Sequence, residues 1–426
     1  MTATTPAGDQ ISIQDFENEA AAWLKSNAKR KVAKDGPAPK WGEGEFSVSI
    51  FHNLEHDHEQ NLLNEIASWI QTKAEKGYNA ITWPPEFGGL GLSQQHARAY
   101  TRLERDYDLP GRHEAISVTM GLMAPTIRQF GSDEQKAKHI ETFLKAEELC
   151  IQLFSEPNAG SDLAGLACRA VKDGDEWVVN GQKVWTSGAQ FAQWGQLIAR
   201  SDVDAPKHKG QTAFILPLDL PGIEVRPIKQ MSGGTSFNEV FFNDVRVPDS
   251  MRLGDEGEGW KVALTTLGFE RDHSQDSGGG GSKTGGSWTQ VLELARALGV
   301  TQDPITRQKL ADLYIHSHVE SYTLRRSADL AKGGTPGPEG SLGKLLWTEG
   351  LTRLSGVVSD ILGCRLIADT GEWGTYGWGE HVLGAPGYRI AGGSDEIQRN
   401  IIGERVLGLP GEPRTDKAMP WKDIPR

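Results

Sequence analysis

The chain has 426 residues, of which 37% are hydrophobic, and a formal net charge of −12 from 45 basic and 57 acidic side chains. That size allows about two or three domains with a substantial core, and the acidic balance disfavours a nucleic-acid partner. The sequence has no apolar run near the roughly 20 residues that span a bilayer, no signal-peptide features in residues 1–10, and no CxxC pattern among Cys150, Cys168 and Cys364. We therefore expect a cytoplasmic protein with reduced thiols and no membrane segment.

Residues 11–148 show the apolar spacing of helices. Phe16, Ala20 and Leu24 recur every four residues, which places them on one helix face. A loop rich in Pro and Gly at 83–91 interrupts the helical spacing, which then returns. These features predict a helical N-terminal domain.

Short β-type runs replace the helical pattern in residues 149–254. Asn180 and Gly181 lie between two such runs, and both residue types tolerate a positive φ. This pair therefore predicts a tight hairpin. We expect the whole middle region to form an antiparallel sheet or a small barrel.

Helical spacing resumes beyond residue 254 and predicts a helical domain at 255–412. Long helices are expected at 308–331 and 341–363, after a Gly- and Ser-rich loop at 274–287. Ser394 is a suitable N-cap for a further helix because its hydroxyl can accept from the free N–H groups of a first turn. The predicted fold class is α+β, with an N-terminal helical domain, a middle antiparallel β domain and a C-terminal helical bundle.

Three motifs carry the candidate chemistry. The first is CIQLFSEPNAGSD at 150–162, in which residues 155–162 make a rigid, donor-rich turn suited to an anionic or polar cofactor edge. The second is NGQKVWTS at 180–187, and the third is GGSDEIQRNIIGERVLGLP at 392–410. In this order and spacing the three motifs resemble those of the acyl-CoA dehydrogenase family of flavoenzymes, over roughly residues 15–412.

The resemblance implies the fold and the reaction of that family. The middle β domain and a C-terminal four-helix bundle would hold FAD between them. The expected reaction is α,β-dehydrogenation of an acyl-CoA thioester to the trans-2-enoyl-CoA, with hydride transfer to flavin N5. An electron-transfer flavoprotein is the expected acceptor, and a homotetramer or a hetero-oligomer is the expected assembly.

The resemblance also assigns residues of the first two motifs to FAD. Residues 152–155 would line the flavin ring, and Ser155 would donate to the N5 region. In the second motif Trp185 would pack against the flavin, although an aromatic residue in a hairpin core is the alternative interpretation. The flavin-lining and flavin-bonding residues expected from both motifs are Gln152, Leu153, Phe154, Ser155, Trp185, Thr186 and Ser187.

Further cofactor contacts are expected outside the flavin ring. Ser161 would reach the FAD pyrophosphate, where Gly160 allows close backbone approach. Ser394 and Glu396 would contact FAD at the start of the helix in the third motif, although capping alone would also explain Ser394. Arg296 is the nearest match to an arginine that holds FAD across a subunit interface in the family, but the Phe-Gly pair beside it is replaced by Leu-Gly.

The catalytic base requires a different argument, because many members of the family carry it where this chain has Gly392. Glu270 is the candidate instead, since its spacing from Leu267 and Ala263 places it near the apolar face of a helix. A desolvated carboxylate there would be a stronger base, and a subgroup of the family has its glutamate at the matching position. An ion pair with a basic neighbour is the alternative. Arg271 would lie near the thioester, and the Gly392 N–H would donate to the thioester carbonyl.

Two other functions stay open at this point. The absent glutamate at Gly392 is also what a catalytically impaired partner subunit would show, and a flavin oxidase or monooxygenase could use the same scaffold. The acyl group is undetermined, although the 274–287 insertion could shape the mouth of its cavity. No metal site is expected, because His52, His56 and His58 lack a recognisable ligand scheme and fit a solvated helix face.

Overall fold

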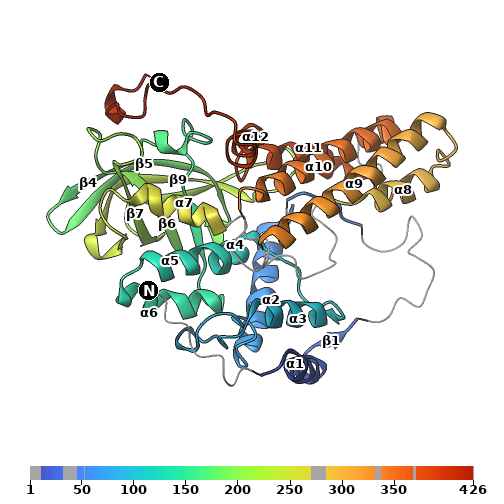
Figure 1. Cartoon of the computed structure of the whole chain (residues 1–426), viewed down its shortest axis with the longest axis horizontal. Coiled ribbons are helices and arrows are strands. Elements are labelled where there is room, and N and C mark those ends of the chain that lie inside the picture. Colours follow the sequence, from blue (N-terminus) through green and yellow to red (C-terminus); the bar gives the residue numbers. More distant parts are fainter. Residues whose placement is uncertain are drawn as a thin grey trace.

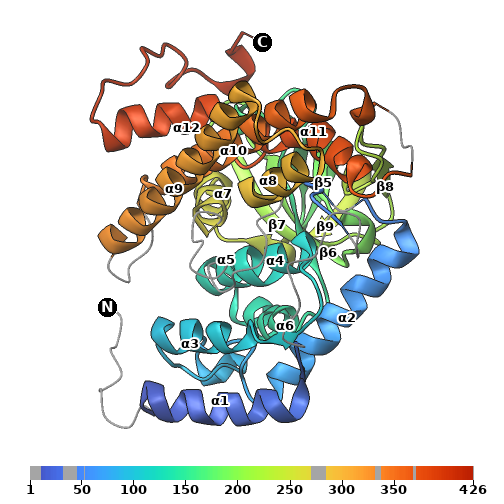
Figure 2. The same cartoon turned by 90° about the vertical axis from the view of Figure 1, so that its right-hand side faces the viewer.

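The structure is a computed structural model that describes residues 11–31, 46–51, 53–269, 285–331, 337–367 and 371–425. It consists of a helical N-terminal region, a central β-sheet region and a helical C-terminal region, which confirms the predicted fold class. Figure 1 shows the sheet on one side of the molecule and the long C-terminal helices on the other, and Figure 2 shows the N-terminal helices at the opposite end from the C-terminal ones. The predicted domain boundaries after residues 148 and 254 fall between secondary-structure elements, and the division into three domains stays a prediction.

The N-terminal helices form where the sequence combines a cap with an apolar face. The Ser12 hydroxyl caps helix α1 by accepting from the Asp15 N–H, and Phe16, Ala20 and Leu24 are buried along one face. A single π turn at 119–123 joins two helices of this region. The elements are α1 Ile13–Asn27, β1 Lys29–Arg30, α2 His56–Ala74, α3 Gln94–Glu104, β2 Tyr107–Asp108, α4 Glu114–Val118, α5 Ala124–Phe130 and α6 Asp133–Leu144.

The middle region is an eight-stranded sheet with the strand order β10-β7-β6-β4-β5-β9-β8. The eighth strand, β3, lies off this order and pairs with β6. Most neighbouring strands are antiparallel, but β6 pairs in parallel with both β3 and β4. Helices α5 and α7 contact each other, and α7 lies on β6 and β7, so one face of the sheet is covered by helices (Figure 1). The strands are β3 Cys150–Leu153, β4 Arg169–Asp173, β5 Glu176–Ser187, β6 Trp194–Arg200, β7 Gln211–Pro217, β8 Ile223–Ile228, β9 Phe237–Pro248 and β10 Arg252–Leu253.

The predicted hairpin at Asn180 and Gly181 is wrong. Strand β5 runs without a break through both residues, and its register against β9 shifts at this point instead. The Asn180 side chain donates to the Asp244 carboxylate at 3.0 Å and accepts from the Asp244 N–H at 3.0 Å. Positive φ values occur at Gly181 (149°) and, on the neighbouring strand, at Asp244 (50°). They accommodate a β-bulge and not a turn.

The C-terminal helices confirm the predicted long segments. Helix α10 contacts both α9 and α11, and the Ser394 hydroxyl caps α12 by accepting from the Ile397 N–H, as predicted. No helix among the described residues is long and apolar enough to cross a membrane. The helices are α7 Gly259–Phe269, α8 Trp288–Ala297, α9 Pro304–Ala331, α10 Gly340–Leu362, α11 Thr375–Ile390 and α12 Asp395–Ile401, which continues into a π turn at 402–406.

A buried histidine joins the N-terminal helices to the sheet. His139 of α6 is 2% exposed, and its ring lies edge-on to Trp194 of β6 at a centroid distance of 4.5 Å. Burial, together with the neighbouring Lys138 charge, lowers the pKa of His139 from 6.5 to about 4. Between about pH 4 and pH 6.5, the His139 ring is therefore neutral in the folded state, whereas it is protonated in the unfolded chain.

We predict that His139 makes the fold sensitive to mild acid. Because its folded-state pKa is lowered, its contribution to stability is complete above pH 6.5 and is lost as the pH falls toward 4. Replacing His139 with Leu should reduce the loss of unfolding free energy over this range by about 1–3 kcal/mol. Denaturant unfolding at pH 7 and pH 4.5 measures the difference. His58→Leu, at an exposed position, is the control, and an equal change in both variants would contradict the assignment.

Candidate active site

The first two motifs are joined by a buried ion pair. Lys183 of β5 is fully buried, and its ammonium donates to the Glu156 carboxylate at 2.8 Å and to the Phe154 carbonyl at 2.9 Å. Glu156 also accepts from the N–H groups of Ala167 and Cys168, at 2.6 and 2.9 Å. The loop that begins at Ser155 is therefore fixed at both its ends. Sequence reasoning missed this pair, although a lysine among inward-facing β residues was a usable signal.

The second motif contains the sharpest backbone irregularity of the site. Trp185 has φ of 62° at a register shift of β5 against β9, and its side chain is 57% exposed. Beside it, the Thr186 Oγ1 and Asn238 Oδ1 atoms are buried and have no hydrogen-bond partner among the described residues. The Asn238 amide is oriented by its bond to the Thr186 carbonyl at 3.0 Å. Unpaired buried polar atoms are costly, so this place suits a polar ligand.

A row of aromatic rings leads from Trp185 to the C-terminal helices. Trp185 lies edge-on to Phe237 at 6.1 Å, Phe237 contacts Phe51 at 5.1 Å, and Phe51 stacks on Tyr388 of α11 at 5.1 Å. Trp347 of α10 lies 4.7 Å from Tyr388. The row therefore brings the end of α11, and with it the third motif, toward the end of β5.

The third motif forms a tight turn before α12. Gly392 and Gly393 have φ of 60° and 81°, which side chains rarely adopt. A Cβ added at Gly392 would meet no atom within 4 Å, so the position opens on free space. Ser394 is 9% exposed as the helix cap, whereas the Glu396 side chain is 74% exposed. The turn thus presents backbone groups and the Glu396 carboxylate rather than a carboxylate at 392.

A second buried carboxylate holds this turn. Asp395 is 1% exposed and accepts from the Thr348 hydroxyl at 2.9 Å and from Arg389 Nε at 2.7 Å. Although burial disfavours its charge, the hydrogen bonds from Arg389 and Thr348 lower the pKa of Asp395. Lys344 of α10 donates to the carbonyls of Tyr388 and Gly393, both at 2.8 Å. Sequence reasoning identified the motif but not these supports.

The remaining predicted residues are placed less closely together. The Leu153 side chain is fully buried in the core of the sheet and Phe154 is 6% exposed, so Leu153 can approach a ligand through its backbone only. Gly160 and Ser161 are exposed on the loop, and Gln152 is half-buried. Arg296 is exposed on α8, where it pairs with Glu293 at 2.6 Å. Glu270 and Arg271 lie outside the described residues.

Glu114 is a neighbour of the second motif that sequence reasoning missed. It is the first residue of α4, and its carboxyl group lies near the Ser187 side chain. Although Glu114 is an exposed residue, partial desolvation of its carboxyl group by the surrounding chain raises the pKa of Glu114, against the opposing effects of His113 and Ser187. The chain after β5 approaches α4 closely here, because a Cβ on Gly188 would come within 2.9 Å of Ala115 Cβ. A protonatable group therefore lies directly beside a predicted flavin contact.

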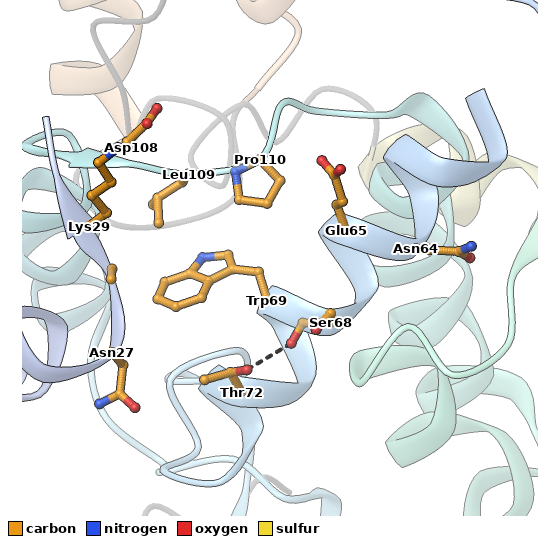
Figure 3. Close-up of a pocket in the computed structure, with 11 residues that line it drawn as sticks. Asn27, Lys29, Asn64, Glu65, Ser68, Trp69, Thr72, Asp108, Leu109 and Pro110 are labelled. Atoms are coloured by element: carbon orange, nitrogen blue, oxygen red, sulfur yellow. Dashed lines mark hydrogen bonds between the residues drawn. The ribbon is translucent and has the colours of Figure 1, made fainter. Parts of the chain in front are cut away.

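A hollow of about 540 Å³ in the N-terminal region is separate from these motifs. Figure 3 shows the Trp69 indole facing Leu109 and Pro110 across it. The Trp69 Nε1 donates to Glu104 at 3.2 Å, so this side chain is part of the helix packing. None of the residues lining the hollow belongs to the three motifs, and the described residues contain no cluster of three or more His, Cys, Asp or Glu that could hold a metal.

Three family models match the chain in the order of its regions. The models of the acyl-CoA dehydrogenase N-terminal, middle and C-terminal domains match residues 50–147, 152–245 and 257–407. The chain belongs to the acyl-CoA dehydrogenase family, flavin oxidoreductases that act on CH–CH bonds. The family identification from the three motifs is thereby confirmed.

Similar proteins extend over almost the whole chain. Acyl-CoA dehydrogenase IpdE1 of Mycolicibacterium smegmatis is 35% identical over 414 residues, covering 94% of this chain and 99% of the relative. IpdE1 of Mycobacterium tuberculosis is 37% identical over 403 residues, covering 94% and 98%. The solved structure of the ChsE4-ChsE5 complex from Mycobacterium tuberculosis has the same fold, with a TM-score of 0.68 at 24% identity, covering 96% and 100%. The Tcur3481-Tcur3483 steroid ACAD has a TM-score of 0.69 at 24% identity, covering 96% and 100%.

The buried pair predicts a large effect of a single charge removal. Lys183→Met would leave Glu156 charged and buried, which typically costs about 3–5 kcal/mol of unfolding free energy. Adding Glu156→Gln should recover part of the loss, because the amide oxygen still accepts a backbone N–H. Lys172→Met is the matched control, since Lys172 pairs with Glu256 on the surface and should change stability by less than about 1 kcal/mol. Equal melting temperatures for the two single variants would contradict the role of Glu156 and Lys183.

Proposed function

We propose that this chain binds FAD and dehydrogenates an acyl-CoA thioester to the trans-2-enoyl-CoA, with Glu270 as the base. The observation that carries the proposal is the end of β5, where Trp185 is exposed and Thr186 Oγ1 and Asn238 Oδ1 are buried without partners. These groups fit the polar edge of a flavin, and membership of an FAD-using family agrees with that fit. Thr186, Ser187 and the loop through Gly160 and Ser161 would hold the cofactor.

The chemistry divides between the cofactor and the chain. When bound, FAD supplies the electron sink for the hydrogen that leaves the β carbon as hydride. The Glu270 carboxylate would remove the α proton, and the Gly392 N–H would donate to the thioester carbonyl as negative charge develops there. The Gly392–Gly393 turn is rigid because Lys344 and Asp395 fix it, so the donor is preorganised. An electron-transfer flavoprotein would then take the electrons.

A partner subunit of a hetero-oligomeric dehydrogenase is the second candidate. Gly392 provides no carboxylate where many members of the family have one, and one relative of the same fold was solved as a ChsE4-ChsE5 complex. An exposed apolar stripe on α9 supports the packing of another protein chain on this helix. Ile315, Val319 and Tyr322 are spaced along one helix face and are 58%, 47% and 64% exposed.

Anaerobic bleaching of the flavin by acyl-CoA thioesters tests the function. The panel should include straight-chain, branched and ring-bearing acyl groups, because one solved structure of this fold is a steroid ACAD. Rapid bleaching by one class would establish the half-reaction and identify the acyl type. Bleaching that occurs only after co-purification with a second chain would favour the partner-subunit candidate, and no bleaching of the FAD-loaded chain in either form would overturn the proposal.

We predict that Glu270→Gln slows the bleaching by about 10²–10⁴-fold, the usual contribution of a general base. Flavin content and melting temperature should stay unchanged, because only a proton acceptor is removed. The matched control is Glu258→Gln, since Glu258 begins the same segment but pairs with Lys261 at the surface. Bleaching at the wild-type rate by Glu270→Gln would remove Glu270 from the mechanism.

Gly392 offers a complementary gain-of-function prediction. The open space at its Cβ position accommodates a side chain, although φ of 60° strains any residue other than glycine by about 1–2 kcal/mol. Adding Gly392→Glu to Glu270→Gln should therefore restore part of the bleaching rate. Adding Gly392→Gln instead should restore none, and this comparison separates a new base from a change in the turn.

A further inference from the structure

The C-terminal tail, residues 411–425, is a distinct segment of the chain. The match to the family model of the C-terminal domain ends at residue 407, before the tail begins. After Gly408, whose φ is 70°, the chain leaves the helical region and runs along the edge of the β region (Figure 1). Its end contacts the loop at 201–210 that joins β6 to β7.

Backbone hydrogen bonds attach the end of the tail to that loop. The Trp421 N–H donates to the Ala205 carbonyl at 3.0 Å, and the Lys422 N–H donates to the Val203 carbonyl at 3.1 Å. Pro420 lies opposite Pro206 in an isolated antiparallel bridge. The tail is therefore docked in a defined register.

A lysine of the loop connects the tail to the first motif. The Lys207 side chain is 5% exposed, and its ammonium lies 3.0 and 3.1 Å from the two carboxylate oxygens of Asp162, the last residue of that motif. The same ammonium lies 3.0 Å from Asp416 of the tail. Arg414 pairs with Asp416 through two bonds of 2.9 and 2.6 Å, and hydrogen bonds from Arg414 and Lys207 hold the pKa of Asp416 far below its usual range.

A second contact between the tail and the segment after the first motif is made by Trp421, which lies over the buried Arg200. Arg200 is 1% exposed, and its guanidinium donates to the carbonyls of Ala164 and Lys207 at 2.6 and 2.9 Å. The Trp421 ring lies 4.8 Å from this guanidinium, and its Nε1 donates to the Gly165 carbonyl at 3.3 Å. Trp421 thus contacts the segment that follows Asp162, and it also contacts Arg200, which holds that segment in place.

We propose that the C-terminal tail is a positioning element of the cofactor site: by docking on Lys207 and Arg200 it fixes residues 162–166 and slows the release of FAD. The tail does not touch the reacting atoms. It acts through Asp162, which directly follows Ser161, the residue assigned to the FAD pyrophosphate, and through Gly165, four residues after Ser161. A loop held in its binding conformation pays less ordering entropy when the ligand binds, so the bound state is favoured. This inference rests on the proposed binding of FAD.

The release of FAD from the holoenzyme tests the proposal. Flavin fluorescence after dilution should show release about fivefold faster from Trp421→Ala than from the wild type at a temperature where both are folded. Trp421→Phe keeps a ring over Arg200 but loses the hydrogen bond to the Gly165 carbonyl, so its release rate should lie between those of the wild type and Trp421→Ala. Asp416→Asn should also accelerate release, whereas Asp423→Asn, at an exposed position of the same tail, should not.

Hydrogen exchange of the apo-protein separates positioning from a general loss of stability. In Trp421→Ala the amides of 163–166 should exchange faster while those of β6 and β7 keep their protection, and turnover at saturating FAD should be unchanged. Equal FAD release from Trp421→Ala and the wild type would overturn the tail proposal alone. A wild-type protein that retains no FAD would overturn the proposed function and the tail proposal with it.

Discussion

The ion pair between Glu156 and Lys183 is the constraint on which the candidate site depends. Both charges are removed from water, and such a transfer costs several kcal/mol per ion unless every polar contact is satisfied. Here two backbone N–H groups and one carbonyl complete the coordination, together with the 2.8 Å contact between the charges. The lysine comes from β5 and the glutamate from the loop after β3. A shift of either motif would therefore separate the two side chains and leave a buried charge without its partner. The pair therefore fixes the first motif relative to the second.

The third motif is held in the same physical manner. Asp395 is buried at the start of α12 and receives hydrogen bonds from α10 and α11, while Lys344 donates to the carbonyl of Tyr388 in α11 and to that of Gly393 in the glycine turn. The loop of the first motif and the turn of the third motif are both rich in Gly and Ser, and each is anchored by a buried charged side chain. This arrangement gives exposed backbone donors a fixed direction, which is what stabilisation of a developing negative charge requires.

Sequence patterns predicted the features that depend on near neighbours. The cap at Ser394 and the helix face of Phe16 depend on residues within one or two turns, and both were predicted correctly. The hairpin at Asn180 was wrong because its outcome is decided by Asp244, a residue 64 positions away. The supports at Lys183 and Lys344 were missed for the same reason, since their partners, the Glu156 carboxylate and three backbone carbonyls, belong to distant segments. The roles of the motif residues toward FAD stay predictions, as does that of Glu270, which lies outside the described residues.

Trp185 connects these structural arguments to binding. A left-handed φ at a bulky residue costs on the order of 1–3 kcal/mol, and an indole that is 57% exposed adds the cost of apolar surface in water. Both penalties fall on one residue, which lies next to two buried polar atoms without partners. A planar ligand with polar edges would cover the indole and bond to those atoms, so a single binding event would offset all three costs. The three costs therefore coincide at the end of β5, where the proposed flavin would lie.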